Sequence, residues 1–170
     1  MDPFSAPWVV LALLGLVVCQ RLGELWLANR NTKALMAMGG EEHGAAHYPL
    51  FVLLHGGWLI ALFPAVSSET VVNWPLIGLF LILQLGRLWV IRTLGRFWTT
   101  RVITVPGAPL VTRGPYRWIR HPNYLVVALE IPVLPLALGL WEIAAVFTVL
   151  NLVLLSYRIR FEDRVLRGRR

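Results

Sequence analysis

The sequence predicts an all-α integral membrane protein that forms a single membrane domain over residues 1–170. Hydrophobic residues make up 57% of the chain and the mean hydropathy is +0.65, far above the range of soluble domains. Apolar runs alternate with polar segments, and the first run, of 22 residues, makes about 33 Å of helix, enough to cross a bilayer. Five transmembrane helices are predicted, over about residues 7–28, 49–66, 74–93, 123–138 and 141–157.

The first predicted span ends in a polar face that contains Gln20, Arg21 and Glu24. Arg21 and Glu24 are three residues apart on a helix, so we interpret them as a local anchor pair near the membrane interface. The N-terminal stretch carries an acidic residue, Asp2, where a signal peptide has basic residues. We therefore expect the first span to be retained. A polar, glycine-rich loop over residues 29–47 follows it.

The third span also ends in a polar face, because Gln84 and Arg87 follow helical spacing. Only residues 139–140 separate the fourth span from the fifth, which predicts a tight helical hairpin. Two prolines inside the fourth span, Pro132 and Pro135, are expected to bend it.

The basic residues predict the orientation of the chain. Six of the 16 lie within residues 92–120 and six within residues 158–170, and none precedes the first span or lies at the hairpin tip. Five spans with the N-terminus outside and the C-terminus in the cytoplasm satisfy the positive-inside rule at every loop. The loop over residues 94–122 and the tail over residues 158–170 then face the cytoplasm together and can share a site.

Several functions are disfavoured by composition. The formal net charge of +7 does not indicate a nucleic-acid-binding protein, because the basic residues lie between apolar runs. The single cysteine, Cys19, excludes a disulfide framework. His43 and His47 have i, i+4 spacing but lack the glutamate of a zinc-protease helix, so we expect no metal. His55 and Glu130 lie inside spans, where ionisable residues form interhelical contacts or mark functional sites.

The densest group of polar and aromatic side chains is the stretch RGPYRWIRHPNY, residues 113–124. Gly114-Pro115 and His121-Pro122 fix the backbone on either side of a short turn. A membrane span cannot contain so many arginines. We therefore predict that this turn holds a polar ligand.

This stretch belongs to the longer segment PLVTRGPYRWIRHPNY, residues 109–124, and after a hairpin the chain continues with RIRFEDRVL, residues 158–166. In this order and spacing, the two segments resemble the isoprenylcysteine carboxyl methyltransferase family of integral membrane enzymes. The resemblance covers about the C-terminal half and implies a pocket for S-adenosylmethionine at the cytoplasmic ends of the last helices. Val126 stands where many members have glycine, and Asp163 where they have glutamate. The resemblance assigns cofactor contacts to Leu110, Val111, Tyr116, His121, Pro122, Asn123, Tyr124 and Glu162, and the acceptor side to Arg158.

The residue types suit S-adenosylmethionine, which needs a cation for its carboxylate, an acid for its amine and aromatic faces for its adenine and sulfonium groups. These are supplied by Arg120, Glu162, Tyr116, Trp118 and Tyr124. A simpler interpretation of Arg158 and Glu162 is a solvated i, i+4 helix pair worth about 0.3 to 0.5 kcal/mol.

The methyl acceptor is expected to be a lipid or a lipidated group that enters from the bilayer. One candidate is the carboxylate of a prenylated cysteine, and the other is the hydroxyl of a phenolic or pyrone lipid. A phenol, with a pKa of about 10, needs a general base, and His121 or Glu162 would be that base. The catalytic candidates are therefore His121, Arg158 and Glu162. Fifteen arginines against one lysine resemble a bacterial protein of high GC content, which favours a phenolic lipid and the inner membrane.

Two other classes of function remain as alternatives. Sterol reductases resemble the same C-terminal half and bind NADPH there, although they are usually longer. A membrane adaptor without enzymatic activity would use its basic inner face to bind anionic lipid.

Overall fold

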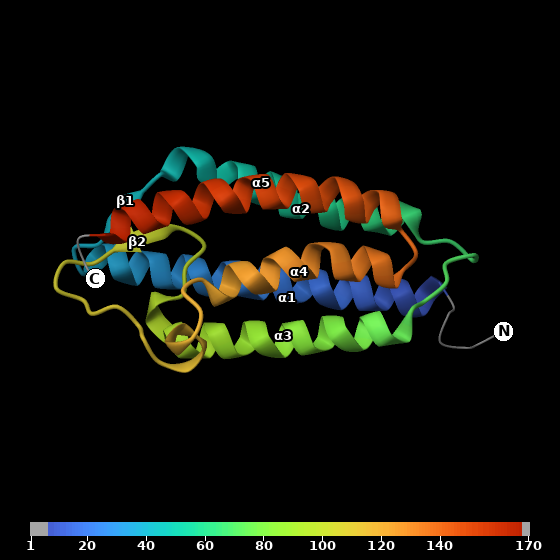
Figure 1. Cartoon of the computed structure of the whole chain (residues 1–170), viewed down its shortest axis with the longest axis horizontal. Coiled ribbons are helices and arrows are strands. Elements are labelled where there is room, and N and C mark those ends of the chain that lie inside the picture. The colour runs from blue at the N-terminus through green and yellow to red at the C-terminus, as the bar shows by residue number, and fades with distance from the viewer. Residues whose placement is uncertain (1–6, 168–170) are drawn as a thin grey trace.

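The computed structural model describes residues 7–167 and shows five long helices packed lengthwise, with successive helices running in opposite directions (Figure 1). This confirms the predicted all-helical architecture. The start of α1 and the end of α5 lie at opposite ends of the bundle. The helices are α1 (Pro7–Ala37), α2 (Tyr48–Ala65), α3 (Trp74–Leu94), α4 (Pro122–Ala137) and α5 (Trp141–Leu166).

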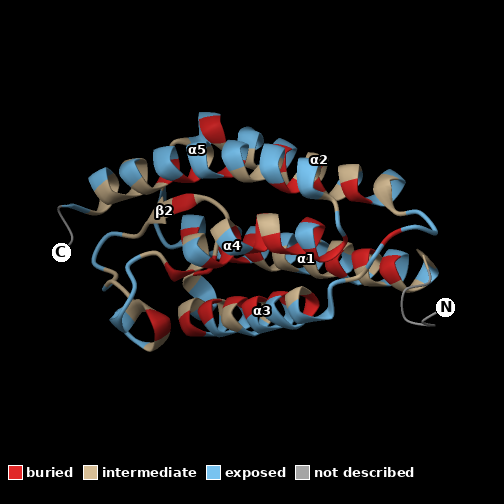
Figure 2. Ribbon diagram, turned by 45° about the vertical axis from the view of Figure 1, so that its right-hand side comes forward, coloured by how far each residue is buried: buried red, intermediate tan, exposed pale blue. Residues whose placement is uncertain are grey.

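Four helices, α1, α2 with its preceding turn, α3 and α5, are long and apolar enough to cross a membrane, as expected of an integral membrane protein. The remaining helix, α4, has only 16 residues and lies in the middle of the bundle, where nine of its residues are buried (Figure 2). The amide of Asn73 donates to the carbonyl oxygen of Ala137 at 2.8 Å, so the end of α4 lies beside the start of α3. A fifth membrane span at α4 stays a prediction.

The hairpin between α4 and α5 is as tight as predicted. The amide of Leu140 donates to the carbonyl oxygen of Pro135 at 2.9 Å, and Gly139 adopts a left-handed conformation with φ 72°. Glycine suits this position because it reaches positive φ without steric cost. The α4 helix packs closely against both α3 and α5 and forms the centre of the hydrophobic core.

Two helices are longer than their predicted spans. The α1 helix continues nine residues past residue 28, since Asn31 and Leu35 are buried and the Asn31 amide donates to the carbonyl oxygens of Gly95 at 3.0 Å and Trp98 at 2.8 Å. The α5 helix continues to Leu166, so most of the predicted tail is helical. Both extensions lie at the same end of the bundle (Figure 1).

Two short strands, β1 (Glu41–His43) and β2 (Val102–Thr104), depart from the all-α prediction. They pair antiparallel, and Arg101 Nη1 contacts Glu42 Oε1 at 2.8 Å. Three residues are too few for a sequence pattern to predict a strand. The pair ties the loop after α1 to the loop after α3. Three single-turn 3₁₀ helices complete the described fold: η2 (Ala45–His47), η3 (Gly95–Phe97) and η4 (Gly114–Arg117).

Replacing Gly114 by alanine is expected to destabilise the fold more than the same change at Gly107. Both glycines have positive φ, 58° and 71°, where alanine costs about 1–2 kcal/mol. Of the two, only Gly114 is crowded, because a Cβ there would lie 2.6 Å from Thr93 Oγ1. A Cβ at Gly107 would have no neighbouring atom within 4 Å. We expect Gly114→Ala to cost about 1 kcal/mol more than Gly107→Ala in denaturant unfolding of detergent-solubilised protein. Equal losses would show that Thr93 moves aside freely.

Candidate functional site

The beginning of α4 and the last turns of α5 bring three predicted site residues into one hydrogen-bonded chain. The Tyr124 hydroxyl donates to Glu162 Oε2 and accepts a hydrogen bond of 3.3 Å from Arg158 Nε. Tyr124 comes from the first turn of α4, and Arg158 and Glu162 lie one turn apart on α5. The hydroxyl therefore bridges the two charged side chains and fixes them on the face of α5 that meets α4.

His121, just before α4, lies beside two carboxylates. Its ring stacks on that of Tyr124 with centroids 5.3 Å apart. Its Nε2 lies 3.3 Å from Asp163 Oδ1, and its Nδ1 lies 4.0 Å from Glu162 Oε1. A pair of acids beside an imidazole and a phenol can attract a cationic group, and the aromatic rings add cation–π attraction.

Arg158 has partners on a second side, away from α4. It is buried, with 6% of its surface exposed, and its Nη2 donates to the carbonyl oxygen of Thr100 at 2.9 Å. Its guanidinium lies 5.4 Å from the ring centroid of Phe51 in α2. Arg158 thus joins the Tyr124 side of α5 to the α2 side, which a solvated i, i+4 pair would not do.

Tyr116 and Asn123 extend this site. Burial, reinforced by the negative charge of Glu162, raises the pKa of Tyr116 well above its usual value, so the phenol stays protonated. Asn123 Oδ1 is buried and makes no hydrogen bond within the described structure. Pro122 is buried next to it in the first turn of α4. An orphaned acceptor on the residue before Tyr124 fits a ligand that donates hydrogen bonds, as the amino groups of S-adenosylmethionine do.

Other predicted contacts lie outside this group. Leu110 and Val111 line an open hollow of about 570 Å³ together with residues at the end of α3. Arg120 and Trp118 are exposed, and the Trp118 ring lies 6.1 Å from that of Trp89. The structure therefore brings His121, Tyr124, Arg158 and Glu162 close together. Leu110, Val111 and Arg120 lie outside this group.

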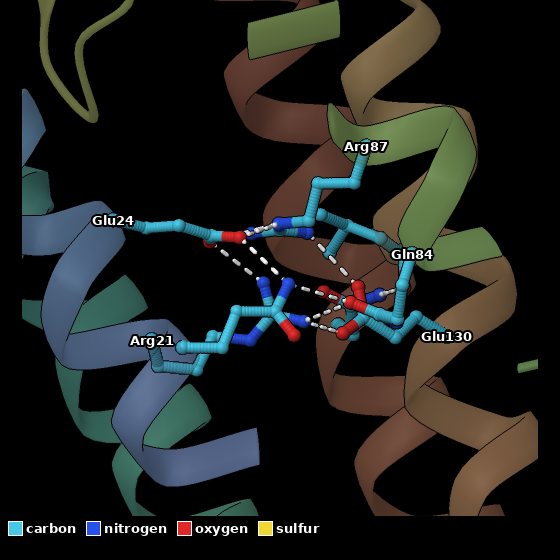
Figure 3. Close-up of polar contacts among 8 residues, drawn as sticks. Arg21, Glu24, Gln84, Arg87 and Glu130 are labelled. Atoms are coloured by element: carbon cyan, nitrogen blue, oxygen red, sulfur yellow. Dashed lines mark hydrogen bonds and ion pairs between the residues drawn. The ribbon is translucent and has the colours of Figure 1, made fainter. Parts of the chain in front are cut away.

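A second polar cluster, which we call the interhelical charge network, lies among α1, α3 and α4 (Figure 3). It consists of Arg21, Glu24, Arg87 and Glu130, with Gln20 and Gln84. The expected local contact of Arg21 with Glu24 is present at 2.8 Å, but Arg21 also pairs with Glu130. Arg87 bonds to Glu24 at 2.8 Å and to Glu130 at 2.9 Å. Two positive and two negative charges thus balance across three helices.

His47 is a buried residue that sequence reasoning considered only as half of a metal pair with His43. His43 instead contacts Thr104 Oγ1 through Nε2 at 2.8 Å. His47 lies at the other end of the turn, among aromatic rings, with 8% of its surface exposed. Within residues 7–167, no three His, Cys, Asp or Glu side chains come together as a metal site.

Comparison with known proteins identifies a family. The model of the isoprenylcysteine carboxyl methyltransferase (ICMT) family matches residues 76–168, from α3 to the end of α5. The chain is also 36% identical over 163 residues to a Bacillus subtilis (strain 168) protein named "Uncharacterized protein YpbQ", covering 94% of this chain and 95% of that protein. No solved structure matches the chain.

Proposed function

The chain belongs to the isoprenylcysteine carboxyl methyltransferase family, and from this premise we propose that it is an S-adenosylmethionine-dependent O-methyltransferase acting on a lipophilic, membrane-borne acceptor. Membership implies methyltransferase activity in general. The observation that carries the finer proposal is the hydrogen-bonded chain from Glu162 through Tyr124 to Arg158, with His121 stacked beside it. In this arrangement Glu162 and the rings of His121 and Tyr124 lie on one side, and the buried guanidinium of Arg158 lies on the other.

The donor side of the proposed site is built by α4 and α5. Glu162 would accept hydrogen bonds from the donor's ammonium group, and His121, Tyr116 and Tyr124 would line the space around its sulfonium. Asn123 Oδ1 would accept a further hydrogen bond. When bound, S-adenosylmethionine supplies an electrophilic methyl group. Leu110 and Val111, through their backbone, and Arg120, through its charge, would complete the outer wall, as the family resemblance implies.

The acceptor side is proposed around Arg158, which faces away from the donor acids toward α2 and the carbonyl of Thr100. A lipid could approach this side from the bilayer while the soluble donor enters from the water phase. Methyl transfer benefits from such a water-poor place, because its barrier falls by positioning and by exclusion of water. We propose a phenolic or pyrone hydroxyl as the acceptor, with the carboxylate of an isoprenylated cysteine as the competing candidate.

We further propose five spans with the N-terminus outside, so that the site faces the cytoplasm of a bacterial inner membrane. The antiparallel order of the helices supports this proposal, since α1 begins at the opposite end of the bundle from the site (Figure 1). The site then lies where the basic residues gather.

Calorimetric titration of detergent-purified protein tests the donor site. We expect S-adenosylmethionine and S-adenosylhomocysteine to bind, and we expect binding to weaken at least about 10-fold in His121→Ala and Glu162→Ala, because each change removes a charge-assisted or stacking contact. The matched control is Glu69→Ala, an exposed glutamate in the loop between α2 and α3. Binding of NADPH instead would favour a reductase, and binding of neither would favour a membrane adaptor.

A further inference from the structure

His47 contains a buried polar atom that the proposed site does not use. The residue ends the η2 turn just before α2, and its Nε2 is shielded from solvent without a hydrogen-bond partner in the described part of the chain. A buried donor or acceptor without a partner costs free energy, and such groups in native proteins call for a specific explanation. A ligand that hydrogen-bonds to this nitrogen would remove the cost.

Three aromatic rings pack against the His47 side chain. Its ring centroid lies 6.4 Å from that of Phe51, 5.2 Å from that of Tyr157 and 4.9 Å from that of Phe161, and each pair meets edge to face. The rings come from α2 and α5, which lie side by side in both views of the bundle (Figures 1 and 2). An aromatic cluster with one polar nitrogen offers edge-to-face contacts and one hydrogen bond to a flat, apolar ring that carries a hydroxyl group.

This aromatic cluster, formed by His47, Phe51, Tyr157 and Phe161, is connected to the proposed methyl-transfer site through Phe51. The Phe51 ring contacts His47 on one side and lies under the Arg158 guanidinium on the other. Arg158 in turn contacts the Tyr124 hydroxyl. The aromatic cluster and the proposed donor side therefore lie on adjacent faces of α5, and both contact Arg158.

We propose that His47 Nε2 is the general base that binds and deprotonates a phenolic hydroxyl on the lipid acceptor. The inference rests on the proposed function and identifies its acceptor class. His121 and Glu162, the two bases expected from sequence, have partners already: His121 contacts Asp163, and Glu162 accepts the Tyr124 hydroxyl. His47 Nε2 has no hydrogen-bond partner among the described residues that an acceptor hydroxyl would have to displace.

The aromatic cluster is tightly covered at Gly44 and borders an open hollow at Tyr157. On one side Gly44 covers His47 so closely that a Cβ there would lie 2.0 Å from His47 Cε1. On the other side Tyr157 is 49% exposed and lines an open hollow of about 610 Å³ on α5. Leu152 and Val153 line the same hollow and would contact an acyl tail. The proposal requires the Tyr157 side chain to rotate, so that a phenolic head can pass from this hollow to His47.

The proposed methyl transfer needs no group beyond the donor, the acceptor and His47. The acceptor O–H bond breaks and its proton goes to His47 Nε2, while the oxygen forms a bond to the methyl carbon of the donor. The carbon–sulfur bond breaks, its electron pair stays on sulfur, and the neutral thioether leaves. The imidazolium then releases its proton to water. A carboxylate acceptor is already ionised at neutral pH and has no use for this base.

The experiment compares two long-chain phenols, one with an ordinary pKa and one nitro-substituted and ionised at the assay pH. For His47→Gln we expect kcat to fall by about 100-fold or more on the ordinary phenol, the usual contribution of a general base, and by less than about 5-fold on the nitrophenol. His47→Phe, which keeps a ring at this position, should show the same losses of kcat as His47→Gln on the two phenols. His43→Gln is the matched control, because His43 has a partner in Thr104.

A second readout needs no methyl donor. The wild-type protein should lower the apparent pKa of the bound nitrophenolic lipid, seen as increased nitrophenolate absorbance, because protonated His47 stabilises the phenolate. Both His47 variants should lose this shift while still binding S-adenosylmethionine.

The outcomes separate the two proposals. Equal losses on both phenols, or no loss on either, would overturn the role of His47 and leave the methyltransferase proposal standing. Wild-type methylation of farnesylcysteine derivatives but not of phenols would also overturn it. A wild-type protein that does not bind S-adenosylmethionine would overturn the proposed function itself.

Discussion

Glu130→Ala is expected to lower the free energy of unfolding by about 3–5 kcal/mol, the usual cost of removing one partner from a buried ion pair. Glu130 is 3% exposed and pairs with both Arg21 and Arg87. Without it, two guanidinium groups would share the single carboxylate of Glu24 in an apolar surrounding. Because native proteins have only about 5–15 kcal/mol of stability, this loss is a large fraction of the total.

Denaturant unfolding in detergent, followed by circular dichroism, measures the effect, and Glu142→Ala at an exposed position of α5 is the control. A double change, Glu24→Leu with Arg87→Leu, should cost less than either single change, because it removes opposite charges together. If Glu130→Ala cost less than about 1 kcal/mol, the interhelical charge network would contribute no more than an exposed ion pair.

Hydrophobic segments and turn residues were sufficient to predict most of the bundle. The bounds of α2, α3 and α4 differ from prediction by one residue at each end at most, and the hairpin at Gly139 is present. The extension of helices beyond the apolar segments was not predictable, because it depends on contacts with residues that are distant in the sequence. The side chain of Asn31, for example, bonds to carbonyl groups of residues 95 and 98.

The candidate site could be predicted in part. Tyr124, His121, Arg158 and Glu162 were identified from two short motifs, and the structure brings them together. The sequence placed Glu130 inside a predicted span, but did not show that Arg21, 109 residues earlier, pairs with it. A helical repeat shows which residues share a face of one helix and contains no information on which helix that face meets.

The aromatic cluster around His47 was missed for the same reason. His47 precedes α2, whereas Tyr157 and Phe161 lie on α5, more than 100 residues later. The available signal was weak: a histidine one residue before an apolar helix whose next turn carries Phe51. Only the packing of α2 against α5 shows that these rings enclose one nitrogen.

Arg158→Lys is expected to lower kcat/KM for the lipid acceptor by about 100-fold or more, even though the positive charge is kept. Arg158 uses different nitrogens for different partners, Nε for the Tyr124 hydroxyl and Nη2 for the carbonyl of Thr100. A lysine ammonium is a single point and cannot reach both partners while also lying over Phe51. The loss should appear mainly in acceptor methylation.

Binding of S-adenosylmethionine to Arg158→Lys should stay within a few-fold of wild type, since Glu162, His121 and Tyr124 remain. The control is Arg92→Lys, at an exposed position near the end of α3, where the change should have no effect. Full activity of Arg158→Lys would show that only the sign of the charge matters at this position. If Arg158→Lys lost both S-adenosylmethionine binding and methylation, Arg158 would lie on the donor side. A position on the acceptor side predicts that methylation falls while donor binding is kept.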